Sequence, residues 1–500
     1  MSPVTACYIP PQTGLSAAAA TPRARENPLA LAWGDIRTLF SVLYLLPKLC
    51  QPFASKNETD ELSLRWSNVW YLGTLVSITV LEAFLLLSSS AVWLLLPGWL
   101  NLVIFAAMLG TVWVLCAPLR GPVVVESRVG LGTGTGRNEH SDERWVFVNG
   151  VMVGNHGLQN NCDRLSWTFG RVITGIHNPT NGLVWDLLEC IFQRSFSYNT
   201  YPTRYTYDHV KRYLTDPGVR KVVLIGHSQG GIIVSMTLDM LFTDLPVENI
   251  AKLEVYTFGS AASHFNNPLR AVDPNCNPKS KQRAQVIKYI EHYVNGEDMV
   301  PRWGVLHNVR CVRTRYSGKV FIRNNATGHM FNQHYLNSIF RLENSSSEYL
   351  NAEGDKGFLD QEVTVDECTC RERKVYTVAA STTGAGSSTA GAKASTIMEG
   401  ASAESTIAEG TTTSDATVEG GAMSGQGNGG SPLLVDTVAD GVGILPMSDG
   451  VVYADDEDDE TAATGMTVRQ LSRLWRYLGG ADADADANGT EDKGGRITMN

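Results

Sequence analysis

The sequence predicts an α/β fold in which a mostly parallel sheet is covered by helices on both faces. Residues 140–345 predict this sheet, because they alternate short, continuously apolar runs with longer amphipathic runs. Two further regions flank the predicted domain. Residues 69–117 are almost uninterrupted apolar sequence, which predicts a two-helix membrane hairpin. Residues 379–430 consist largely of Ala, Gly, Ser and Thr, which predicts a disordered tail.

Charge and cysteine content exclude several classes of protein. The chain has 41 Lys and Arg against 51 Asp and Glu, and residues 371–500 alone have 9 against 20. The remainder is nearly neutral and has no basic stripe, so we expect no nucleic-acid partner. The nine cysteines are scattered without a CxxC pair, which argues against a zinc site and indicates reduced thiols in a cytosolic domain.

The first 65 residues form an N-terminal segment that we expect to be partly disordered. Residues 1–28 contain no long apolar run, so no secretory signal peptide is visible. Residues 29–46 are apolar but are interrupted by Asp35 and Arg37. Such a stretch is typical of a helix that lies flat at a membrane interface.

Residues 66–120 predict a two-helix transmembrane hairpin. One span needs about 20 apolar residues, so the stretch accommodates two, near residues 75–96 and 99–117. Glu82 is the one charge inside the first span. We expect Glu82 to be protonated against the partner helix, to act as a functional carboxylate, or to lie before the span begins.

The flanks of the hairpin predict its orientation. Positive residues lie on both sides of it, which places both of its ends and the following domain in the cytosol. The link at Pro97-Gly98 carries no charge, so it either forms a short lumenal turn or dips into one leaflet without crossing. We therefore expect an integral membrane protein of the endoplasmic reticulum or another endomembrane.

Residues 140–345 predict the α/β domain itself. The expected strands are residues 145–148, 172–176, 221–225, 253–258 and 286–294. The expected helices are residues 158–169, 183–192, 207–214, 231–242 and 330–340. In a parallel sheet of this kind the ligand site lies beyond the carboxyl ends of the strands.

One short motif in this domain points to its chemistry. The sequence GHSQG at residues 226–230 follows an apolar strand and opens a helix. A tight strand-to-helix turn holds a nucleophile in a strained backbone conformation, and it needs small residues such as Gly226 and Gly230. Ser228 is therefore the candidate nucleophile, and the amino end of the following helix favours a developing negative charge there.

A serine hydroxyl needs a base, and the base needs an orienting acid. In this arrangement the chain order is nucleophile, acid and histidine. Asp298 follows a strand and is the favoured acid, with the neighbouring Glu297 and the distant Asp273 as alternatives. The sequence offers two bases, of which we favour His329, because it lies on a loop, over His334, which lies a turn inside the expected last helix.

Two backbone N–H groups should complete the site as an oxyanion hole. One belongs to Gln229, directly after the nucleophile. The other comes from the loop after the first strand, where Val151 is favoured over Met152. Such a site transfers an acyl group to serine and then to water, and it requires no metal or organic cofactor.

These residues resemble the α/β-hydrolase superfamily. GHSQGG is similar to the nucleophile elbow of lipases and esterases. VYTFGSAASHFNNP at 255–268, followed by EDMVP at 297–301, is similar to a stretch of class 3 lipases in which a TFG loop precedes an aspartate and a Val-Pro. The opening at 147–165 and the GH…HYL ending at 328–336 resemble uncharacterised fungal membrane-anchored proteins that are similar to serine esterases. The resemblance implies an α/β-hydrolase fold and ester hydrolysis by Ser228.

Residues 375–500 predict a disordered, acidic, low-complexity tail that includes the run DDEDDE at 455–460. A short amphipathic helix is expected within it at 466–478. Its apolar face carries Val468, Leu471, Leu474, Trp475 and Leu478. This helix would bind an anionic membrane surface or dock back on the α/β domain.

The expected function is that of a membrane-anchored serine hydrolase that cleaves a carboxylic ester. A lipid acyl ester is the favoured substrate, because the hairpin keeps the site near acyl chains. Two alternatives remain on the same sequence. One is a catalytically inactive, hydrolase-like membrane scaffold, and the other is a thioesterase or peptidase that uses the same three side chains.

Overall fold

The computed structural model describes residues 4–12, 27–55, 57–128, 140–270, 285–312, 316–340, 357–366, 463 and 465–484. The expected disorder at 379–430, the acidic run at 455–460 and Asp273 lie outside the described residues. Residues 463–484 belong to the same compact unit as residues 1–377.

The described strands form one sheet in the order β2-β4-β3-β5-β6-β7-β8-β1-β9. The strands are β1 (Thr5–Ile9), β2 (Val124–Glu126), β3 (Glu143–Val148), β4 (Ile173–Ile176), β5 (Lys221–His227), β6 (Leu253–Phe258), β7 (Tyr289–Asn295), β8 (Lys319–Asn324) and β9 (Val363–Val365). Neighbours from β4 to β8 run parallel. The sheet is therefore mostly parallel and of the α/β class, as the sequence predicts.

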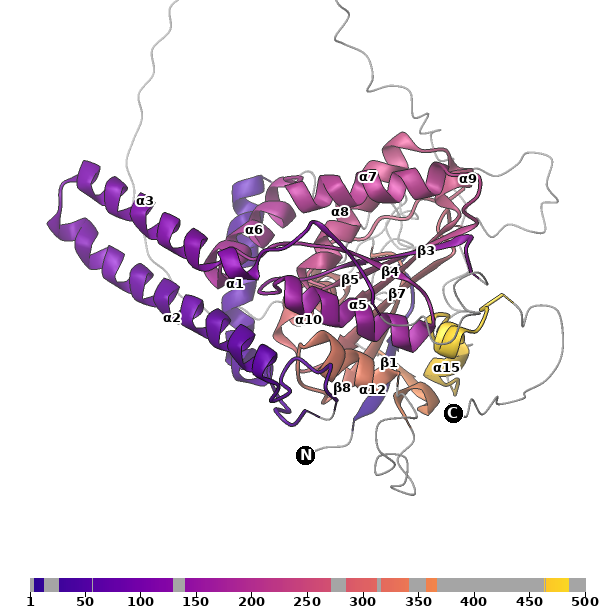
Figure 1. Cartoon of the computed structure of the whole chain (residues 1–500). Helices are drawn as coiled ribbons and strands as arrows, with labels where there is room; N and C mark the ends of the chain where they lie inside the picture. The colour runs from indigo at the N-terminus through magenta and orange to yellow at the C-terminus, as the bar shows by residue number, and fades with distance from the viewer. Residues whose placement is uncertain are drawn as a thin grey trace, which may run out of the picture. The chain divides into compact units, whose positions relative to one another are not determined.

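Helices cover both faces of this sheet (Figure 1). They are α5 (Asn155–Phe169), α6 (Leu183–Phe196), α7 (Tyr201–Thr215), α8 (Gln229–Asp244), α9 (Val247–Ile250), α10 (Met299–Trp303), α11 (Val305–His307) and α12 (Asn337–Ile339). Side chains alternate along each strand, so β3 sends Val146 and Val148 to the core under α6, α7 and α8. Trp145 and Phe147 enter the opposite core, which α5 and residues 331–340 cover.

Four strands of the sheet were not expected from the sequence. One is β2, which pairs with β4 in antiparallel register at one side of the sheet. Strand β8 lies beside β7, and β1 from the N-terminal segment pairs with β8 in antiparallel register. Strand β9 then pairs with β1. The helix expected at 330–340 is instead a π-helical turn at Phe331–Leu336 that continues into α12.

The apolar hairpin forms two helices, α2 (Trp66–Leu95) and α3 (Gly98–Leu115), which run side by side and project from the domain (Figure 1). Glu82 of α2 has a partner on the domain that the sequence did not predict. Its Oε2 accepts a hydrogen bond from Val184 N at 3.2 Å and so caps the start of α6. Tyr71 of α2 also binds the domain, because its hydroxyl donates a hydrogen bond to Met152 O at 2.9 Å.

A third apolar helix, α1 (Pro28–Val42), lies on the domain surface. Asp35 is buried beneath it and pairs with Arg194 of α6 at 2.8 Å. Within the described residues, three helical segments are long and apolar enough to cross a membrane. They are Pro28–Lys48, Trp66–Ser89 and Gly98–Leu119.

Candidate active site

The turn between β5 and α8 holds Ser228 in a backbone conformation that side chains rarely adopt, with φ 57° and ψ −121°. The glycines on either side of Ser228 are required because backbone atoms lie where a side chain would begin. A Cβ on Gly230 would lie 2.2 Å from Val148 O, and a Cβ on Gly226 would lie 2.8 Å from Gly230 O. The end of β3 therefore excludes a side chain at Gly230, and the start of α8 excludes one at Gly226.

Asp298 lies where β7 ends and α10 begins, and its side chain is fully buried. Its Oδ1 accepts a hydrogen bond from Val300 N at 3.0 Å. Its Oδ2 accepts from His329 Nδ1 at 2.6 Å and from the Tyr335 hydroxyl at 2.7 Å. Because Nδ1 keeps its proton and donates a hydrogen bond to the carboxylate, the Nε2 atom of His329 carries the lone pair that a general base needs.

Ser228 and His329 are connected in the structure through His227, the residue before Ser228. The Ser228 Oγ and the His329 Nε2 are both buried, and neither has a hydrogen-bond partner among the described residues. The His227 ring links the two residues, because its centroid lies 4.7 Å from that of His329 and its Nε2 donates to His329 O at 2.9 Å. The structure thus has no hydrogen bond between Ser228 and His329, and bonds of this kind often form only when a substrate is bound.

The alternative site residues have other partners. In His334 the Nδ1 accepts from Met330 N at 3.0 Å, and the Nε2 donates to Pro52 O at 3.1 Å. Burial lowers the pKa of His334, in keeping with a neutral ring whose two nitrogens are both engaged. Glu297 pairs with Lys48 at 2.9 Å and with Arg302 at 2.8 Å. The structure therefore brings Asp298 to His329 and not to His334.

The expected oxyanion donors lie on both sides of Ser228. Neither Val151 N nor Gln229 N donates a hydrogen bond to a group that the structure describes. Met152 N, the second choice for the loop, donates to Asp186 Oδ2 at 3.0 Å and is occupied. Val151 N and Gln229 N, the two favoured donors, are therefore both without a partner among the described residues.

A chain of amides, which the sequence analysis did not identify, holds this loop in place. Asn149 donates to Asn178 O at 2.8 Å and accepts from Asn178 N at 2.8 Å. The Asn178 side chain donates to Gln229 Oε1 at 2.6 Å, and Gln229 Nε2 donates to Gln193 Oε1 at 3.2 Å. The spacing of these amide residues along the chain does not indicate that they form hydrogen bonds with one another, so only the folded structure identifies them.

The described residues contain no group of three or more His, Cys, Asp or Glu side chains placed to hold a metal ion. What they assemble is a strained serine, an oriented imidazole and two unused N–H groups. Together these groups suit nucleophilic attack on a carbonyl carbon.

No known protein family and no curated protein matches the sequence. Two solved structures show a slight likeness. A Trichoderma reesei cutinase in complex with a C11Y4 phosphonate inhibitor is 23% identical, with a TM-score of 0.18, over 24% of this chain and 52% of the cutinase. A Pyrobaculum calidifontis esterase is 14% identical, with a TM-score of 0.24, over 43% of this chain and 80% of the esterase. The chain thus matches about half the length of the cutinase, and at these TM-scores neither likeness determines the function.

The Asp298–His329 contact leads to a testable expectation. The change Asp298→Asn keeps the shape of the side chain but removes the charge that holds the proton on Nδ1. We expect the reaction of Ser228 with a fluorophosphonate to slow by about 10⁴-fold. The matched control is Glu297→Gln, whose rate should stay within about twofold of the wild type. Equal rates for Asp298→Asn and the wild type would contradict the assignment.

Proposed function

We propose that the protein is a serine hydrolase of the α/β-hydrolase superfamily that cleaves a carboxylic ester through Ser228, His329 and Asp298. The observation that carries the proposal is the buried Asp298–His329 contact beside the strained Ser228 turn. The order of elements supports it, because these residues follow β5, β7 and β8, whose carboxyl ends lie at one edge of the sheet.

The reaction follows from the geometry. The His329 Nε2 accepts the Ser228 proton as the Oγ attacks the ester carbonyl, and Asp298 stabilises the imidazolium that forms. The N–H groups of Val151 and Gln229 bind the oxyanion. His329 then protonates the departing alcohol, and a water molecule, activated by the same imidazole, releases the acid and regenerates Ser228.

The hairpin formed by α2 and α3 is proposed to anchor this hydrolase in one leaflet of a membrane. Up to Glu82, α2 packs on the domain, and about 13 residues remain before α2 ends at Leu95. They extend roughly 20 Å, whereas the hydrocarbon core of a bilayer is about 30 Å thick. Of the two geometries that the sequence left open, the structure favours the hairpin that enters without crossing.

Apolar side chains beside the hairpin extend the proposed membrane-facing surface. Trp33 and Phe40 of α1 are each 68% exposed. On α6, Trp185, Phe192 and Phe196 are 40–50% exposed, and the rings of the last two lie 5.3 Å apart in a tilted arrangement. The same helix carries Gln193, which accepts a hydrogen bond from Gln229, the residue after Ser228. The helix α6 therefore connects this apolar surface to the Ser228 turn. That position favours a lipid acyl ester as substrate, delivered from the cytosolic leaflet of an endomembrane.

Covalent labelling tests the nucleophile. A fluorophosphonate added to the detergent-solubilised protein should modify Ser228, and mass spectrometry of the digest locates the adduct. Ser228→Ala should abolish the label, and Ser235→Ala, which changes a buried serine on α8, should retain it. Lack of label on the wild type would favour the inactive scaffold. Faster turnover of thioesters or peptides than of acyl esters would favour the alternative hydrolases.

The hairpin geometry has its own test. Gly98→Cys places a thiol at the turn between α2 and α3, and a membrane-impermeant maleimide is added to the lumenal side of sealed vesicles. We expect labelling only after detergent dissolves the membrane, because the turn stays inside the bilayer. Labelling from the lumenal side of intact vesicles, absent from the wild type, would show that the hairpin crosses.

A further inference from the structure

The edge of the sheet opposite Ser228 carries a row of charged side chains near the amino ends of adjacent strands. These residues, here called the amino-edge row, are Glu143, Lys221, Glu254, Glu291 and Lys319. All but Lys319 are at least 94% buried. Buried charges of this kind destabilise a fold unless each has a partner.

The distal segment, residues 463–484, covers this row. It begins with α15 (Val468–Leu471), breaks at Ser472, and continues as a 3-10 helix at Leu474–Gly480. The single amphipathic helix expected at 466–478 is therefore interrupted, because Ser472 turns its hydroxyl to Glu291 Oε2 at 3.1 Å. Of the two roles expected for this segment, the structure places it on the domain.

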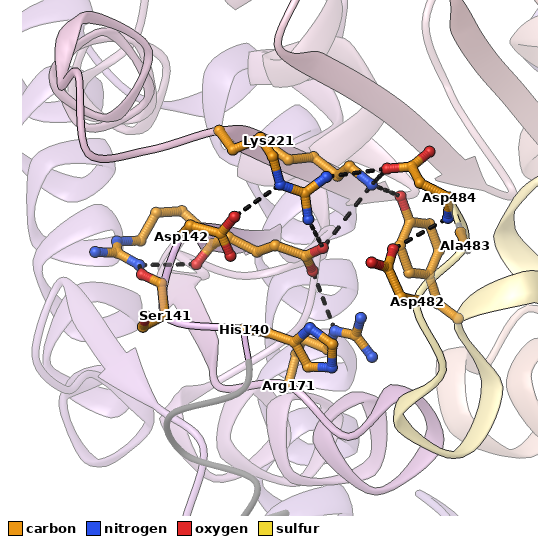
Figure 2. A network of polar contacts seen from close by, with 12 residues as sticks. His140, Ser141, Asp142, Arg171, Lys221, Asp482, Ala483 and Asp484 are labelled. Carbon is orange, nitrogen blue, oxygen red and sulfur yellow. Dashed lines mark hydrogen bonds and ion pairs between the residues drawn. The ribbon is translucent and has the colours of Figure 1, made fainter. Parts of the chain in front are cut away.

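The segment supplies hydrogen bonds to four members of the row. Lys221 Nζ donates to the Tyr477 hydroxyl at 2.9 Å and to Asp484 Oδ2 at 2.7 Å. Figure 2 shows Lys221 and Asp484 facing each other across this contact. Tyr477 in turn donates to Glu254 Oε2 at 2.7 Å.

The other two members of the row, Glu291 and Lys319, form hydrogen bonds with the backbone of the segment. Arg473 N donates to Glu291 Oε1 at 2.6 Å, and Lys319 Nζ donates to Leu471 O at 2.9 Å. A short bridge between Glu362 and Thr467 ties the segment to the end of β9.

Arg473 lies at the centre of the contact and is 7% exposed. Its guanidinium donates to Glu254 Oε1 at 3.3 Å, to Ala483 O at 2.9 Å and to Asp484. It also lies 4.5 Å from the centre of the Tyr289 ring. Removal of this side chain would leave Glu254 buried with one partner fewer.

Apolar packing accompanies the polar contacts. Val468, Leu474 and Tyr477 are fully buried. The Tyr477 ring meets Trp145 edge to face at 5.0 Å, and so becomes part of the core beneath α5. The distal segment thus contributes to the folded domain as a core element does.

We propose that the amino-edge row is a peptide-binding site whose ligand is the distal segment of the same chain, and that this segment stays bound when its covalent connection is cut. The chain separates Asp366 from Ala463 by 96 residues, so the contacts and not a short connection must fix the position of the segment. The site lies at the edge of the sheet away from Ser228, so the segment stabilises the domain without touching the reacting groups.

The test uses the full-length protein with a site-specific protease sequence inserted after residue 420 and an affinity tag at the carboxyl end. After cleavage, the two fragments of the wild type should co-purify on the tag. Arg473→Gln should weaken the association by about 100-fold or more, because Glu254 and Asp484 lose their shared partner. Arg476→Gln changes the same residue type in the same segment, and its side chain forms no hydrogen bond or ion pair with the described residues, so this control should co-purify as the wild type does.

A second measurement separates loss of binding from failure to fold. An excess of a synthetic peptide of residues 463–484 should raise the melting temperature of the cleaved Arg473→Gln protein, and the same peptide carrying Gln at position 473 should not. The proposal is overturned if the cleaved wild-type fragments separate while the larger one keeps its melting temperature. Association of the Arg473→Gln fragments as tight as in the wild type would also overturn it.

Discussion

The candidate site depends on one buried carboxylate. Asp298 has no contact with solvent and fills both of its oxygens with donors from α10, His329 and Tyr335. A carboxylate placed in this way cannot turn, so it fixes both the orientation and the tautomer of His329. In the proposed mechanism the strained Ser228 turn needs this imidazole as its base, and the packing of β3 against Gly230 holds the turn in place.

Polar side chains at the two ends of the parallel strands differ in how they are paired. At the carboxyl ends of the strands, the Ser228 Oγ and the His329 Nε2 lack hydrogen-bond partners among the described residues. The amino edge carries five charged side chains, and the distal segment provides partners for four of them. Two polar groups thus lack partners at the carboxyl ends of the strands, while the amino ends are covered by hydrogen bonds and apolar packing that stabilise the domain.

The sequence predicted what is local and missed what is distant. Apolar runs identified β3 to β7, and the expected order of acid and histidine gave Asp298 and His329, which are in contact in the structure. The approach of Ser228 to His329 stays a prediction. Strands β1 and β9 were not predicted because they are short and because their partners lie more than 300 residues away along the chain. The hydrogen-bond partner of Glu82 was not predicted for a related reason. It is a backbone N–H of α6, and every residue type except proline has such a group, so the sequence does not identify it.

The most direct test of the central claim is a structure determined after a phosphonate ester has reacted with the protein. The account predicts phosphorus bonded to Ser228 Oγ and a phosphoryl oxygen within hydrogen-bond distance of Val151 N and Gln229 N. It also predicts His329 Nε2 within reach of the adduct, with Nδ1 still on Asp298. An adduct on another residue, or one that faces His334 instead of His329, would contradict it.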